Sequence, residues 1–123
     1  MEELIIHSGE IIKLDPMTIV RFINEYPYRG VADIQIQNYI DADDFIDTSN
    51  GLHLNGTSEH QAHRIASLVN LIKREIQPDI ITLLIDRYRT KTVCSLEDGN
   101  HRLRAYLFLN KLIPVRISYD SWI

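Results

Sequence analysis

The order of sequence patterns towards the C-terminal end constrains the fold of this chain more than any other feature. Residues 80–86, "IITLLID", and residues 91–98, "KTVCSLED", are rich in apolar and β-branched side chains, which is typical of strands. After Gly99, residues 100–110 have the pattern of a largely buried helix, and "IPVRIS" at 113–118 predicts another strand. This strand–strand–helix–strand order, preceded by a long helix, predicts a small mixed α/β domain of the α+β class.

The long helix is predicted at residues 58–76, where apolar residues recur every three or four positions. Ser58 and Gln61 match a capping box and so predict where this helix starts. Its predicted core positions are Ala62, Ile65, Val69, Ile72 and Ile76. A second helix is predicted from Pro16, with Asp15 as its N-cap. The apolar face of that helix is expected to contain Ile19, Phe22 and Ile23.

Three shorter patterns complete the expected organisation. Residues 3–14 hold two apolar runs around a Ser-Gly pair, which indicates a hairpin. Residues 32–40 alternate between apolar and polar side chains, which predicts a half-buried strand. Residues 41–57 are acidic and then rich in glycine and asparagine, which predicts a loop. Within it, residues 47–57 are either a lid over a site or a solvated connection.

Length, charge and cysteine content limit the classes of function. A chain of 123 residues suits one domain, and its net charge of −4 argues against broad electrostatic binding of nucleic acid or anionic membranes. A single cysteine, Cys94, excludes an internal disulfide and a multi-cysteine zinc site. The acidic start "MEELIIHSGE" does not resemble a signal peptide, and no apolar run approaches the roughly 18 residues of a membrane span. We therefore expect a cytoplasmic protein with no membrane partner.

The segment "EDGNHRLRAY" at 97–106 places cationic side chains at the expected start of a helix. His101, Arg102 and Arg104 lie within five residues after Gly99, although the N-terminal end of a helix already carries about half a positive charge. A bound anion would resolve this unfavourable arrangement. Gly99 would permit close backbone approach, the N–H groups near residues 100–102 would point at the anion, and Arg102 would clamp it. His101 would act as a hydrogen-bond donor or a proton carrier.

The order of elements around 97–117 resembles the ParB/sulfiredoxin-like superfamily, whose members carry a Gly-x-[His/Arg]-Arg type motif at such a strand-to-helix turn. The resemblance covers a core at residues 32–118, so that residues 1–31 form an N-terminal hairpin-helix extension of a single domain, 1–123. Members bind nucleotide phosphates at this turn: sulfiredoxins use ATP, ParB proteins use CTP, and free serine kinases use ADP or ATP. The resemblance therefore implies that ATP, ADP or CTP is the ligand.

The resemblance also implies roles for individual residues. The phosphates would lie against Gly99, Asn100, His101 and Arg102, and Asp98 would bind Mg²⁺ or act as a general base. Glu59, at the start of the preceding helix, would add a carboxylate across the cleft. With Asp98, His101 and Glu59 as catalytic residues, the protein would hydrolyse a nucleotide or transfer a phosphoryl group.

Two departures from family patterns keep other functions open. Asn100 stands where a sulfiredoxin has its nucleophilic cysteine, and the expected mid-strand position of Cys94 does not replace it. The sequence also ends soon after its last strand, with no helix-turn-helix domain as in chromosome-partitioning ParB proteins. One alternative is a metal-dependent nuclease that needs His101. The other is a non-catalytic binding or regulatory module of phage or mobile-element origin.

Each candidate residue also has a structural interpretation. His101 and Arg102 could simply pair with Glu97 and Asp98, Asp98 could cap the helix, and Arg104 is expected to be solvated or ion-paired. His60 and His63 lie three residues apart, but two imidazoles are few for a zinc site, so a solvated helix start is favoured. The basic connection of Arg87, Tyr88, Arg89 and Lys91 could contact a nucleic-acid backbone, although a solvated turn is favoured. The expected core residues of the last helix are Leu103, Tyr106, Leu107 and Leu109.

Overall fold

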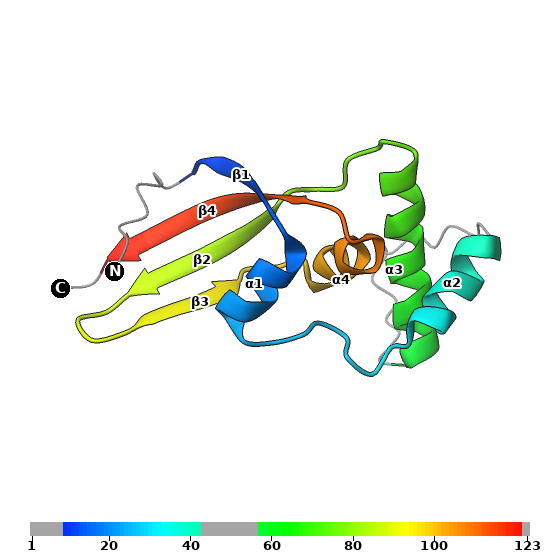
Figure 1. Ribbon diagram of the computed structural model, residues 1–123, viewed down its shortest axis with the longest axis horizontal. Helices are drawn as coiled ribbons and strands as arrows, with labels where there is room; N and C mark the ends of the chain where they lie inside the picture. The colour runs from blue at the N-terminus through cyan, green and yellow to red at the C-terminus, as the bar shows by residue number, and fades with distance from the viewer. Residues whose placement is uncertain (1–8, 43–56, 122–123) are drawn as a thin grey trace.

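A computed structural model describes residues 9–42 and 57–121, which form four helices and one four-stranded mixed sheet. The strand order across the sheet is β1-β4-β2-β3. Helices α2 and α3 lie at one end of the molecule, and the connection between β2 and β3 lies at the other (Figure 1). The prediction of a small mixed α/β domain is thereby confirmed.

The sheet combines both kinds of strand pairing. β2 (Ile81–Arg87) is antiparallel to β3 (Thr92–Leu96) and parallel to β4 (Ile113–Ser121), and β1 (Ile11–Leu14) pairs antiparallel with β4. The register places Ile81 opposite Val115. Alternate residues of these strands face the helices and are fully buried, as period-two patterning requires: Ile81, Leu83, Ile113, Val115 and Ile117.

Helix α1 (Pro16–Ile23) starts as its sequence predicts. The carboxylate of Asp15 accepts a hydrogen bond from the backbone N–H of Met17 at 2.8 Å, and Pro16 occupies the first turn. Ile19 is fully buried, whereas Phe22 remains 46% exposed. Only part of the predicted apolar face therefore reaches the core, because α1 lies against β3 and α4 on one side only.

Helix α3 (Ser58–Lys73) is the longest helix of the described residues and packs between α2 and α4. Its N-cap is Thr57, whose hydroxyl accepts from the N–H of His60 at 3.2 Å, so the prediction that Ser58 caps it is wrong by one residue. Four of the predicted core positions are buried, but Ile76 is 51% exposed because the helix ends before it. Glu75 has a positive φ of 61°, a left-handed conformation that ends the helix.

The prediction of a strand at residues 32–40 is wrong, because these residues belong to helix α2 (Asp33–Ala42). The alternation that suggested a strand is carried by Ile34 and Ile36. Only Ile36 is buried, together with Ile40 four residues later, which is helical spacing. The side chain of Gln35 reaches back to accept from the N–H of Ala32 at 2.9 Å, as the third residue of a helix does in a capping box.

Two other expectations fall partly outside the described residues. The first arm of the hairpin predicted at residues 3–14 lies outside the described residues. The second arm is β1, which pairs with β4, a strand far away in the sequence. The N–H of Gly9 donates to the carbonyl of Ile117 at 2.6 Å and extends this pairing. The predicted loop at 41–57, with its candidate lid, lies almost entirely outside as well. Asp41 and Ala42, the start of that loop, are the end of α2.

Candidate functional site

The turn between β3 and α4 (Asn100–Leu109) is built around Gly99. This residue is buried and has a φ of 106°, a left-handed conformation that favours glycine. A β-carbon at this position would lie only 2.2 Å from Cγ2 of Ile81 at the start of β2. Both the backbone conformation and the close approach to β2 therefore require glycine here.

Helix α4 starts without a side-chain cap. The N–H of Gly99 donates to Oδ1 of Asp98 at 2.7 Å, while the N–H groups of the first helical turn have no acceptor within the helix. These groups and the helix dipole give this end a partial positive charge. The turn thus has the general form of an anion site.

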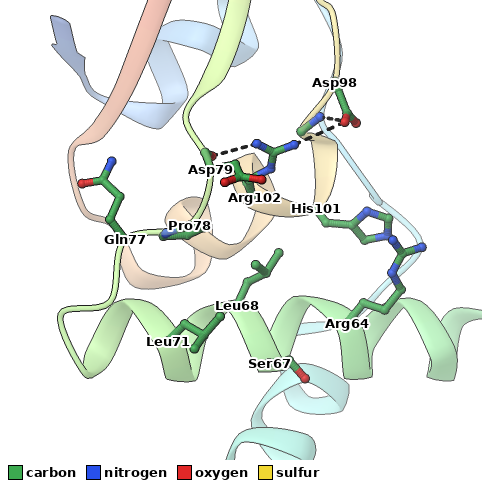
Figure 2. A pocket seen from close by; sticks show the side chains of 11 residues that line it. Arg64, Ser67, Leu68, Leu71, Gln77, Pro78, Asp79, Asp98, His101 and Arg102 are labelled. Atoms are coloured by element: carbon green, nitrogen blue, oxygen red, sulfur yellow. Dashed lines mark hydrogen bonds and ion pairs between the residues drawn. The ribbon is translucent and has the colours of Figure 1, made fainter. Parts of the chain in front are cut away.

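Arg102 is held in place by two contacts. Its Nη1 donates to the carbonyl of Asp79 at 2.7 Å, and its Nη2 lies 3.3 Å from Oδ2 of Asp98 (Figure 2). The carboxylate of Asp98 is 88% exposed, so this ion pair is screened by water and contributes little. Arg102 thus pairs with Asp98, as its structural interpretation predicts. The guanidinium of Arg102 also borders a cavity.

A cavity of about 440 Å³ opens beside this turn. It lies between α3, the segment before β2, and the start of α4. One part of its wall is polar and charged, with Arg64, Arg102, the carboxylates of Asp79 and Asp98, and the imidazole of His101. Another part is formed by Leu68, Leu71 and Pro78 (Figure 2). Its size is within the range of about 300–1,000 Å³ typical of small-molecule sites.

Arg64 brings a second guanidinium to this cavity, from α3. Figure 2 shows it beside the imidazole of His101. Among the described residues no carboxylate pairs with Arg64, and the side chain is only partly exposed. Two arginines from different elements thus flank one cavity together with the carboxylates of Asp79 and Asp98, and within the described residues Arg64 forms no ion pair.

The imidazole of His101 connects three parts of the fold. Its Nδ1 lies 3.2 Å from the hydroxyl of Tyr28, and its Nε2 is hydrogen-bonded to Oε1 of Gln61 on α3. Burial lowers the pKa of His101 to about 4, and the positive charge of Arg64 is the second largest cause. His60 and Arg102 lower this pKa further, whereas the negative charge of Asp98 raises it. His101 is therefore neutral at pH 7, and both of its ring nitrogens are engaged.

The lowered pKa of His101 predicts a pH-dependent stability. Above pH 6.5 the ring is neutral in both the folded and the unfolded chain; as pH falls towards about 4, only the unfolded chain gains the proton. The free energy of unfolding should therefore decrease across this window, and less so in His101→Gln. Urea unfolding at several pH values within the window measures it. Equal slopes for both proteins would contradict this interpretation of His101.

The two predicted carboxylates have different surroundings. Asp98 borders the cavity, and each of its oxygens already accepts a hydrogen bond. Glu59 does not line the cavity: its carboxylate accepts from Tyr39 at 2.6 Å and from Gln35 at 2.7 Å, and these bonds lower its pKa. Glu59 thus ties α2 to the start of α3 and does not line the cavity beside the turn at 98–102.

Of the two outcomes expected for Arg104, solvated or ion-paired, the structure shows the ion pair. Its side chain is buried and ion-paired with Asp33, and its Nη2 also donates to the carbonyl of Val31 at 3.2 Å. Its guanidinium lies over the ring of Tyr26, 5.5 Å from the centroid. The third cation of the "HRLR" segment therefore anchors the connection between α1 and α2, and takes no part in the cavity.

The other predicted features lie away from the cavity. His63 stacks on Tyr39 with ring centroids 4.6 Å apart, and within residues 9–42 and 57–121 no group of three potential metal ligands is found. Leu103 and Tyr106 are buried, and Leu107 and Leu109 pack against the core from partly exposed positions. Cys94 lies within β3, as expected. No helix within 9–42 and 57–121 is long and apolar enough to cross a bilayer.

The sequence interpretation missed several residues of the site: Tyr28, Gln61, Arg64 and Asp79. A signal was present for two of them, because Gln61, Arg64, Leu68 and Leu71 share one face of α3 next to its core stripe. Neither known protein-family models, nor curated proteins, nor solved structures match this chain.

Proposed function

We propose that this chain binds a nucleoside di- or triphosphate in the cavity at the start of α4, as a member of the ParB/sulfiredoxin-like superfamily. One observation carries the proposal: Arg64 and Arg102, from separate elements, border a single cavity beside an uncapped helix start. Two guanidinium groups beside the positive end of a helix favour an anion there, although Asp79 and Asp98 also line the cavity.

The surroundings of the cavity support a ligand with both a phosphate and an apolar part. The phosphates would accept hydrogen bonds from the N–H groups of residues 100–102 and from the two guanidinium groups. The nucleoside would lie towards Leu68, Leu71 and Pro78, which give the cavity its apolar wall. ATP, ADP and CTP each have a phosphate part and a nucleoside part that would match these two parts of the cavity wall.

Mg²⁺ and phosphoryl transfer form the second part of the proposal. Asp98 is the carboxylate beside the turn, and carboxylates together with substrate phosphates are the usual ligands of Mg²⁺. The carboxylate of Asp79 lines the same cavity, and the ion would arrive bound to the nucleotide phosphates. The exposed Asp98 side chain would then exchange its weak pairing with Arg102 for the metal.

A second candidate is nucleotide binding without turnover. It is favoured by the engagement of both His101 ring nitrogens, which leaves this imidazole without a free basic nitrogen. The nuclease alternative has no such supporting observation.

A thermal-shift panel of ATP, ADP, CTP and GTP, with and without Mg²⁺, tests the proposal. We expect at least one nucleotide to raise the melting temperature, because a ligand at a hundred times its dissociation constant adds about 2.7 kcal/mol to the stability. No shift with any nucleotide would refute the proposed binding. For a nucleotide that binds, phosphate release that is lost in Asp98→Asn distinguishes an enzyme from a binding module.

A further inference from the structure

Tyr28 contacts His101 from the side away from the cavity. It lies in the connection between α1 and α2 and has a positive φ of 52°, which is uncommon for a bulky residue. Its ring stacks on the imidazole with centroids 4.3 Å apart, and its hydroxyl oxygen lies 3.2 Å from Nδ1. Tyr28 is not among the residues that line the cavity.

The partner of the other ring nitrogen fixes the direction of both hydrogen bonds. An amide oxygen can only accept, so Nε2 of His101 must carry the hydrogen that Oε1 of Gln61 receives. In the neutral imidazole Nδ1 then has a lone pair, and the hydroxyl of Tyr28 donates to it. Tyr28 and Gln61 therefore select the same tautomer.

The connection that carries Tyr28 is itself anchored to α4. Arg104 binds the carbonyl of Val31 and the carboxylate of Asp33 on one side of Tyr28, and contacts the ring of Tyr26 on the other. The guanidinium of Arg104 is buried, whereas the carboxylate of Asp33 is 71% exposed. The hydroxyl of Tyr28 is thus held in position before any ligand arrives.

We propose that Tyr28 is a positioning residue of the nucleotide site: its hydroxyl keeps the proton of His101 on Nε2, so that the neutral ring can donate to a phosphate oxygen that takes the place of Gln61 Oε1. This inference rests on the proposed function. A neutral donor suits the site, because an imidazolium beside Arg64 and Arg102 would add a third positive charge to the empty cavity.

The position of the proton can be tested without a ligand. Two-dimensional ¹H–¹⁵N spectra of the histidine ring at neutral pH distinguish a protonated from an unprotonated nitrogen. In the wild type we expect a protonated Nε2 and an unprotonated Nδ1 for His101. A proton on Nδ1 would overturn the proposal, whatever the variants show.

Tyr28→Phe then tests whether the hydroxyl of Tyr28 keeps the proton of His101 on Nε2. The variant keeps the stacked ring and loses the hydroxyl, so we expect the two ¹⁵N shifts of His101 to move towards each other as the tautomers mix. Tyr26→Phe is the matched control, because the Tyr26 hydroxyl makes no hydrogen bond among the described residues. Unchanged His101 shifts in a folded Tyr28→Phe protein would overturn the role of Tyr28.

The ligand measurement separates this inference from the proposed function. For a nucleotide that binds, Tyr28→Phe should weaken the affinity roughly three- to tenfold, in proportion to one hydrogen bond, and Tyr26→Phe should not. Equal affinities for wild type and Tyr28→Phe would overturn the phosphate role of His101. If no nucleotide binds while the ring signals respond as expected, the proposed function fails and only the positioning of the proton stands.

Discussion

Gly99→Ala is expected to destabilise the protein by about 2–5 kcal/mol. A left-handed conformation costs a non-glycine residue about 1–2 kcal/mol, and a forced steric contact in a packed region adds about 1–3 kcal/mol. Both costs apply here, because φ is 106° and the new β-carbon would lie 2.2 Å from Cγ2 of Ile81. Urea unfolding followed by circular dichroism measures the change.

Gly30→Ala is the matched control for this substitution. No atom lies within 4 Å of a β-carbon placed at Gly30, and its φ is not in the left-handed region, so we expect a change within about 0.5 kcal/mol. In an Ile81→Ala background the cost of Gly99→Ala should also decrease, since the clashing Cγ2 is gone. Equal stability of Gly99→Ala and Gly30→Ala would contradict the described turn.

Arg64→Ala is expected to weaken nucleotide binding about 10- to 100-fold with little change in stability. A hydrogen bond to a charged group is worth about 1.5–3 kcal/mol, which corresponds to this range of affinity. Arg64 has no ion-pair partner among the described residues, so its removal should change the free energy of unfolding by no more than about 0.5 kcal/mol. Isothermal titration calorimetry with the nucleotide selected by the thermal-shift panel measures the affinity.

Two further variants show whether the weaker nucleotide binding expected for Arg64→Ala is specific to the cavity at the start of α4. Arg89→Ala removes an exposed arginine from the β2–β3 connection, at the other end of the molecule, and should leave the affinity unchanged. Arg102→Ala should lower both affinity and stability, because Arg102 also binds the carbonyl of Asp79. If Arg64→Ala bound the nucleotide as tightly as Arg89→Ala, the ligand would not occupy this cavity.

The C-terminal part of the fold could be predicted because each of its signals is local. Gly99 marks a turn, Leu103 and Tyr106 lie one turn apart on a buried helix face, and the strands on either side have short apolar runs. The α2 segment was mispredicted because Ile34 and Ile36 alternate like a strand. What decides its structure is the burial of Ile36 and Ile40 against α3, a tertiary contact that a local pattern does not contain.

The candidate site was predictable only where it is continuous in sequence. The turn from Asp98 to Arg102 is local and predictable. For Arg104 an ion pair is one of the two expected outcomes, but its partner Asp33 could not be identified because it lies 71 positions away in the sequence. The same reason applies to Tyr28, which meets His101 only through the packing of the α1–α2 connection on α4. The cations of "HRLR" therefore divide into residues that border the cavity and a residue that holds the fold together.

The most direct test of the proposed site is a nucleotide titration followed by ¹H–¹⁵N correlation spectra of the backbone and arginine side chains. The proposed binding mode predicts that the largest shift changes occur at the amides of Gly99 to Arg102 and at the Nε–H groups of Arg64 and Arg102. Signals of the β2–β3 connection should stay unchanged. A saturating nucleotide that shifts other regions and leaves these groups unaffected, or no saturable change with any nucleotide, would contradict the account.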